Sequence, residues 1–237
     1  MHKASLLFCA AVLACSVPVS SHAQATTPES AFSRVMSRVD LGVSGAGMFT
    51  HTASGPITQT EAPDYHYCPT TGPCVPATLT DKTSNTLGAI VTIRYQHRPW
   101  VGFEFNGSYA RYTENYTSNT TQTALFPFQV QTRASEYTFG YVAQPLFTVF
   151  GLRPYFGAGG GFLEFKPTGH GGEGQQTEAR PVVYYSGGLQ KDINGYLGIR
   201  AGIREIFFEA PDFNANYLTI QKRTYTVQPT AGFYLKF

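Results

Sequence analysis

The chain ends on residues 224–237, Thr-Tyr-Thr-Val-Gln-Pro-Thr-Ala-Gly-Phe-Tyr-Leu-Lys-Phe, and this stretch decides the fold. Successive side chains of a β-strand point to opposite faces. At that period one face of the stretch is apolar and the other is mostly polar. The apolar face carries Tyr225, Val227, Ala231, Phe233, Leu235 and Phe237. The pattern predicts a one-sided strand, with Pro229 at a bulge because proline cannot donate to a ladder.

The start of the chain has the pattern of an export signal. A short basic start, Met1-His-Lys, precedes a mostly apolar run over residues 4–19, and small-x-small sites end at Ala23 and Ala25. This pattern predicts a secretory signal peptide over residues 1–23, cleaved after Ala23 or Ala25. The apolar run is too short for a spanning helix, which needs roughly 20 residues. Lipidation of Cys15 is the alternative.

The composition differs from that of an ordinary soluble domain. Charged residues make up 14% of the chain, against about 25% in soluble domains. A net charge of +2 gives no sign of a nucleic-acid partner. Two of the four cysteines lie in the predicted signal peptide. In an oxidising compartment the close pair Cys68 and Cys74 predicts a disulfide. A metal site there is the alternative, with only His66 nearby.

Two neighbouring segments, residues 87–96 and 101–109, give the sharpest local prediction. Both alternate between apolar and polar side chains on either side of Pro99. A hairpin folded there places Ile93 opposite Phe105 on the apolar face and Arg94 opposite Glu104 on the polar face. A slip of one residue would send every apolar side chain to the wrong face. The sequence therefore predicts one register for this hairpin.

Further strands are expected along the chain at residues 40–49, 136–142, 153–165, 180–190 and 196–204. Long loops are expected over residues 51–83, 113–128, 166–179 and 209–221, with short turns at the other end. This asymmetry is typical of transmembrane barrels, whose apolar side faces lipid. We therefore predict one eight-stranded antiparallel up-and-down transmembrane β-barrel over residues 38–237.

The polar faces of these strands carry charges that such a barrel would enclose. An eight-stranded barrel is just wide enough for side chains to fill its interior. Charges removed from water need partners, so we predict a salt-bridge network in the lumen. Arg94 with Glu104 and Asp40 with Lys236 are the expected pairs. The whole set is Asp40, Arg94, Glu104, Glu136, Arg200, Arg204 and Lys236. A gated narrow path for ions or water is the alternative.

The mature chain resembles the small bacterial outer-membrane barrels of the OmpA/OmpX type over its whole length. Its ending, Gly232-Phe-x-Leu235-x-Phe237, is similar to the C-terminal signal read by the barrel-assembly machinery, although Ala231 replaces the usual polar residue before the glycine. The resemblance implies a monomer in the bacterial outer membrane. It also implies two partners, membrane lipid and the assembly machinery, with residues Gly232, Phe233, Leu235 and Phe237 as the assembly signal.

The sequence offers no catalytic constellation. The run Gly169-His-Gly-Gly-Glu-Gly174 matches a dinucleotide fingerprint but lacks the strand before it and the helix after it. The histidines are scattered over loops. We therefore expect no enzyme, no cofactor and no metal, and a structural or surface-interaction role with an extracellular ligand at the loops. The alternatives are a porin-like conduit or binding barrel for small solutes, and a soluble lipocalin-like barrel with an apolar interior.

Overall fold

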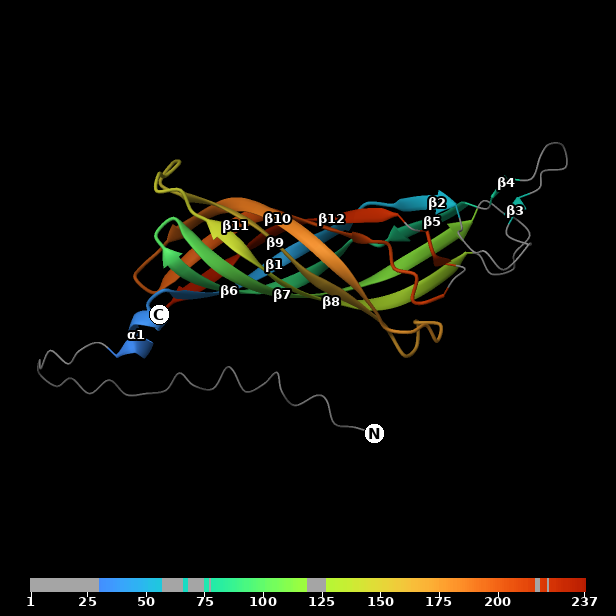
Figure 1. The fold of residues 1–237 in the computed structure, drawn as a ribbon, viewed down its shortest axis with the longest axis horizontal. Coiled ribbons are helices and arrows are strands. Elements are labelled where there is room, and N and C mark those ends of the chain that lie inside the picture. Colours follow the sequence, from blue (N-terminus) through green and yellow to red (C-terminus); the bar gives the residue numbers. More distant parts are fainter. Residues whose placement is uncertain are drawn as a thin grey trace, which may run out of the picture.

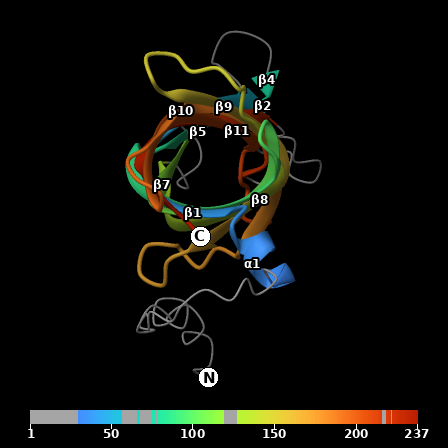
Figure 2. The ribbon, with the colours of Figure 1, turned by 90° about the vertical axis from the view of Figure 1, so that its left-hand side faces the viewer.

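The structure is a computed structural model, which describes residues 30–56, 66–67, 75–76, 78–118, 127–215, 218–220 and 222–237. Eight long antiparallel strands close into a barrel (Figures 1 and 2). Each pairs with the next along the chain, and the last closes on the first. They are β1 (Val39–Thr50), β6 (Thr86–Arg98), β7 (Val101–Ser118), β8 (Phe128–Ala143), β9 (Arg153–Pro167), β10 (Glu178–Asp192), β11 (Leu197–Glu209) and β12 (Arg223–Lys236). The predicted eight-stranded barrel is confirmed.

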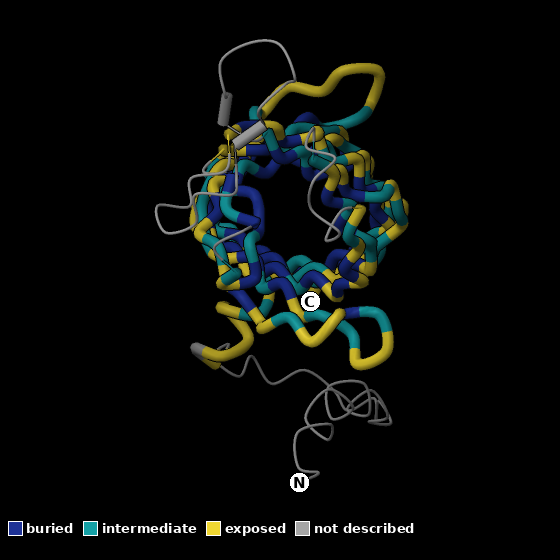
Figure 3. Tube along the Cα trace, turned by 90° about the vertical axis from the view of Figure 1, so that its right-hand side faces the viewer, coloured by how far each residue is buried: buried dark blue, intermediate teal, exposed yellow. Residues whose placement is uncertain are grey.

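The register of the strands follows from their one-sided pattern. In the β6–β7 hairpin Ile93 lies opposite Phe105 and Arg94 opposite Glu104, as predicted. Exposed and buried residues alternate around the wall of the barrel (Figure 3). The exterior is apolar over the middle of the barrel, where a soluble protein would be charged. Its exposed side chains include Val43, Val91, Ile93, Phe105, Tyr109, Phe139, Tyr141, Phe162, Ile199, Ile203, Phe233 and Leu235.

The two ends of the barrel differ. Short connections, the C-terminus and the helix α1 (Ala31–Met36) lie at one end (Figure 1). The Ser30 hydroxyl caps α1 by accepting a hydrogen bond from the Ser33 amide at 3.1 Å. Among the described residues no helix is long and apolar enough to cross a membrane. In barrels of this kind the short connections lie at the periplasmic end. The end that carries α1 and the C-terminus is therefore the periplasmic end.

The extracellular end contains more β-strand than the sequence predicts. The segment 51–83, expected as a loop, contains β2 (Ala53–Pro56), β3 (His66–Tyr67), β4 (Val75–Pro76) and β5 (Thr78–Thr83). β5 pairs with the outer end of β7, which runs to Ser118 through part of the second expected loop. Outward positions there are polar, because the strands have risen above the lipid. The apolar–polar alternation that identifies a membrane strand is therefore missing.

Pro229 does not lie at a bulge, so that prediction is wrong. It faces outward in β12 and lies opposite Ile203 in an unbroken β11–β12 register. On the other side, the pairs between β1 and β12 stop after Ala46 with Thr230 and resume at Phe49 with Val227 in the same register. The missing N–H of proline thus removes ladder pairs without adding a residue.

Candidate functional site in the barrel lumen

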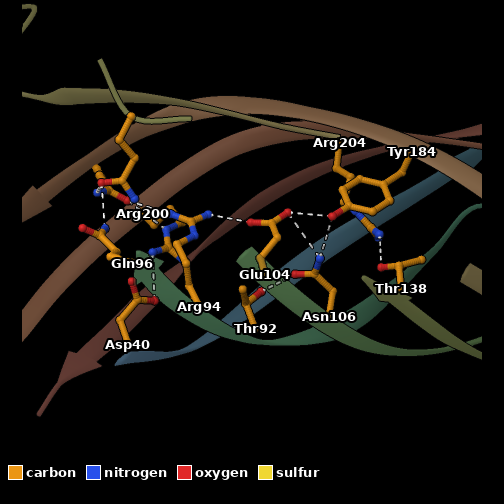
Figure 4. Close-up of polar contacts among 12 residues, drawn as sticks. Asp40, Thr92, Arg94, Gln96, Glu104, Asn106, Thr138, Tyr184, Arg200 and Arg204 are labelled. Atoms are coloured by element: carbon orange, nitrogen blue, oxygen red, sulfur yellow. Dashed lines mark hydrogen bonds and ion pairs between the residues drawn. The ribbon is translucent and has the colours of Figure 1, made fainter. Parts of the chain in front are cut away.

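The periplasmic half of the lumen is built around the predicted pair Arg94 and Glu104. Their inward strand positions leave them only 1% and 4% exposed, with Arg94 Nη2 2.8 Å from Glu104 Oε2. The other carboxylate oxygen of Glu104 accepts hydrogen bonds from the Tyr184 hydroxyl at 3.0 Å and the Asn106 amide at 3.4 Å (Figure 4). Both oxygens of this buried carboxylate therefore have partners, as burial of a charge requires.

Two arginines of β11, Arg200 and Arg204, hold two more carboxylates of the lumen. Arg204 binds Glu136 through two parallel contacts, at 2.5 and 2.9 Å. Its Nη2 also donates to the Thr138 hydroxyl at 2.7 Å. Arg200 Nη2 lies 3.1 Å from Asp40 Oδ1. Paired contacts of this kind fix the orientation of a guanidinium as well as neutralising it.

Tyrosine rings and a glutamine join the ion pairs into one network. The guanidinium groups of Arg94 and Arg200 lie 4.9 and 5.5 Å from the ring centre of Tyr155, within cation–π range. Arg204 lies 4.2 Å over Tyr184. The side-chain oxygen of Gln190 accepts from both Arg94 and Arg200, each at 3.2 Å. Side chains from strands all around the wall therefore meet across the lumen.

Little space is left between these side chains. A cavity of about 40 Å³ is bordered by Arg94, Glu104 and Arg204, and one of about 10 Å³ lies next to Glu136. A single water molecule needs roughly 10–15 Å³ of such volume. The spaces bordered by this network are therefore small.

One ion pair that we predicted from the sequence does not form. Asp40 and Lys236 lie opposite each other on β1 and β12, but Asp40 contacts Arg200. The ammonium group of Lys236 lies 2.5 Å from Asp192 at the periplasmic rim, where both side chains are 34% exposed. The predicted Asp40–Lys236 pair is therefore wrong. Strand pairing fixes neighbouring backbones, whereas a long arginine can reach a carboxylate across the lumen.

The extracellular half of the lumen is filled by an apolar core instead. The connection between β11 and β12 folds inward, and its side chains Phe213, Leu218 and Ile220 are at most 2% exposed. We call the described residues 210–215 and 218–220 the inner loop. It packs against inward side chains of the surrounding strands, which include Leu79, Tyr116, Val130, Leu163, Phe165, Val182, Ile206 and Phe208. The expectation of an outer loop over residues 209–221 is wrong for this inward-folded part.

Polar contacts hold the inner loop to the wall. Glu178 accepts hydrogen bonds from the backbone N–H groups of Asp212 and Phe213 at 2.9 and 2.7 Å. Arg180 contacts Asp212 at 3.0 Å and also pairs with Glu178. The Tyr116 hydroxyl donates to the Pro211 carbonyl at 2.8 Å. The sequence signal for this loop was the unusual number of apolar residues in a supposedly exposed segment.

A buried acidic pair, Asp81 and Glu114, lies beside this core. Outward positions of β7 here are Arg111, Thr113 and Asn115, so the pair lies above the lipid. Thr83 donates to Glu114 Oε2 at 2.6 Å. Burial raises the pKa of the Glu114 carboxyl to about 7. Burial and the neighbouring Glu114 charge raise the pKa of Asp81 well above its ordinary value.

The other predicted site residues have separate places. Phe233, Leu235 and Phe237 are exposed at the periplasmic end of the chain. Gly232 faces inward, and a Cβ there would lie 2.1 Å from the Val43 carbonyl, so close packing of β1 requires glycine. The Gly169–Gly174 run lies in the loop between β9 and β10.

Metal-binding chemistry has little support in the part of the chain that is described. No group of three or more His, Cys, Asp or Glu side chains that could hold a metal occurs there. Cys68 and Cys74 lie outside the described residues.

Comparison with known proteins identifies the fold. No protein-family model matches the sequence, and no curated protein matches it. The structure is similar to OprG from Pseudomonas aeruginosa, with a TM-score of 0.55 and 11% identity over 84% of this chain and 95% of that one. It is also similar to neisserial surface protein A, with a TM-score of 0.52 and 8% identity over 84% and 97%.

Both neighbours are small bacterial outer-membrane barrels, and the shared feature is the fold. The fold and the apolar band around it are those of a protein that crosses the bacterial outer membrane, as the sequence predicted. The identities are too low to carry a function from either neighbour.

Proposed function

We propose that the protein is a closed structural barrel of the OmpA/OmpX type, which displays its extracellular end for contacts at the cell surface. The filled lumen carries this proposal. A charged network occupies the periplasmic half and the inner loop occupies the extracellular half, so two unlike barriers lie in series. A conduit needs a continuous water-filled path, and packing of this kind opposes one.

The surface role is supported by the length of the outer strands. β7 continues to Ser118 beyond its outward aromatic Tyr109, and β5 adds a further strand beside it. This extension raises a rigid wall above the lipid, and binding sites on rigid elements are more precise than those on free loops. An extracellular ligand is the proposed partner of this wall.

Export and assembly belong to the same proposal. Residues 1–23 act as the signal peptide, and Cys68 and Cys74 form a disulfide after export. Residues Gly232, Phe233, Leu235 and Phe237 guide the chain to the assembly machinery. Deletion of Phe237 is expected to reduce assembly in cells and leave refolding in detergent unchanged. An equal loss in both assays would show that Phe237 is structural and carries no signal.

Single-channel recording in planar lipid bilayers tests the closed barrel. Refolded protein, first shown to be folded by its altered migration in SDS before boiling, is expected to give no steady openings. Regular openings in protein that passes this check would contradict the proposal and favour the narrow, porin-like conduit.

A further inference from the structure

The periplasmic mouth of the barrel contains a cavity that has no part in closing the lumen. Its volume is about 370 Å³, within the range of small-molecule sites, about 300–1,000 Å³. The end of α1, the β6–β7 turn and the periplasmic ends of β9 and β12 bring the lining side chains together. They include Arg38, Gln96, Arg98, Arg153, Gln190 and Lys236.

The cavity is strongly basic. Four cationic side chains line it, against the single carboxylate of Asp40, which is already bound to Arg200. Arg153 and Lys236 share the carboxylate of Asp192. Within the described residues, Arg38 and Arg98 have no ion-pair partner. Two exposed guanidinium groups therefore stand at the rim with their charge uncompensated.

Two glutamine side chains, Gln96 and Gln190, also line the cavity. Gln96 and Gln190 both donate to the side-chain oxygen of Gln144, at 2.9 and 3.3 Å. The oxygen of Gln190 is occupied by Arg94 and Arg200. The amides of Gln96 and Gln190 are thus held by neighbouring side chains, and the cationic side chains give the cavity its excess of positive charge.

Backbone pairing brings the chain positions of the two free arginines to the mouth. The backbone N–H of Gln96 donates to the Arg38 carbonyl at 2.8 Å, which joins the short segment after α1 to β6. Arg98 lies at the β6–β7 turn, opposite Val101. A guanidinium presents its N–H groups as a planar fork, which matches the oxygens of a phosphate. Two such forks with an excess of positive charge favour a dianion.

From this geometry we propose that the periplasmic mouth binds a phosphate group through Arg38 and Arg98, with Lys236 and Arg153 adding charge. The phosphate can be a free anion or the headgroup of a phospholipid, because the mouth opens at the inner face of the membrane. The two sources share one recognition chemistry, and they differ in whether the binding molecule carries acyl chains.

Calorimetric titration of the refolded full-length barrel tests this site. Inorganic phosphate is one probe, and short-chain phosphatidic acid below its micelle concentration is the other. At least one probe is expected to bind, and the double variant R38Q/R98Q is expected to weaken that binding by at least about tenfold, equal to about 1.4 kcal/mol. Binding of phosphate identifies a free anion, and binding of the lipid alone identifies a headgroup.

The matched control removes a cation far from the mouth. Arg133 is exposed on β8 at the extracellular end, and R133Q is expected to bind both probes like the parent. Heat-dependent migration in SDS verifies that each variant is folded. The proposal is overturned if neither probe binds to the parent, if R38Q/R98Q binds normally, or if R133Q loses as much affinity as R38Q/R98Q.

Discussion

The two halves of the lumen solve the same packing problem with opposite chemistry. The periplasmic half encloses three arginine–carboxylate pairs, whereas the extracellular half encloses a core built around Phe213 and Leu218. Inside the lipid-embedded part the exterior is apolar, so the polar face of each strand has to turn inward. Above the lipid the exterior is wet, so polar residues can face outward and apolar ones can pack inside.

The difference teaches that the surroundings of the wall decide what fills the barrel. The lower, periplasmic half has an apolar surface and a charged interior. The upper, extracellular half follows the rule of soluble domains, with an apolar core and a polar surface. The change occurs along single strands: β11 places Arg204 inward and then Ile206 and Phe208 inward two and four residues later.

The largest expected effect comes from breaking the lower half at Arg94. Arg94→Met leaves the buried Glu104 without its charge partner, which costs about 3–5 kcal/mol in the free energy of unfolding. Urea unfolding in lipid vesicles measures the loss. The double variant R94M/E104L removes both charges and is expected to recover much of it. A loss below about 1 kcal/mol for the single variant would show that water reaches Glu104.

A somewhat smaller loss is expected from the upper half. Phe213→Ala empties the centre of the apolar core and costs about 3 kcal/mol, the lower end for a buried phenylalanine because the inner loop can relax. Hydrogen exchange should rise in residues 210–220 and stay unchanged around Arg94. The control is Phe150→Ala in a fully exposed turn position. Faster exchange throughout the barrel would mean that the two halves unfold as one.

The exterior of the lower half is tested by a charge on the lipid face. Ile93 is 45% exposed on the apolar band, and Ile93→Lys is expected to cost about 2 kcal/mol, with larger values nearer the midplane. Leu87→Lys, at the extracellular end of β6, is the control, with a cost below about 1 kcal/mol. Unfolding in vesicles compares them. Equal stability of the two variants and the parent would contradict the assigned lipid face.

The smallest effect is a pH dependence confined to the upper half. The pKa of Glu114 is raised from 4.5 to about 7 in the folded state, so its folding contribution is greatest below the unfolded value and is lost as pH rises. From about pH 5 to about pH 6 the expected loss is about 1 kcal/mol. Exchange at β5 and β7 amides should increase over this interval, and Glu114→Gln should reduce the change, leaving the part that the raised pKa of Asp81 contributes. An unchanged profile in that variant would assign the effect to another group.

The sequence predicted the lower half far better than the upper half. Ile93, Arg94, Phe105 and Glu104 alternate cleanly because lipid lies on one side of the wall, and alternation fixes register. In the run Ile206-Phe-Phe208 both faces of the strand are apolar, so the sequence pattern does not show which side chains point into the lumen. The partner of Asp40 was missed for another reason. Arg200 reaches Asp40 across the lumen, and the pairing of neighbouring strands does not show which side chains meet there.

The central claim, two independent barriers in series, is tested most directly by single-channel recording of three variants. Deletion of residues 212–219 removes the inner loop, and R94A/E104A opens the charged network. Each change alone is expected to leave the bilayer silent, because the other half still closes the lumen, and the combination is expected to give steady openings. Openings with either change alone, or silence of a folded combined variant, would contradict the account.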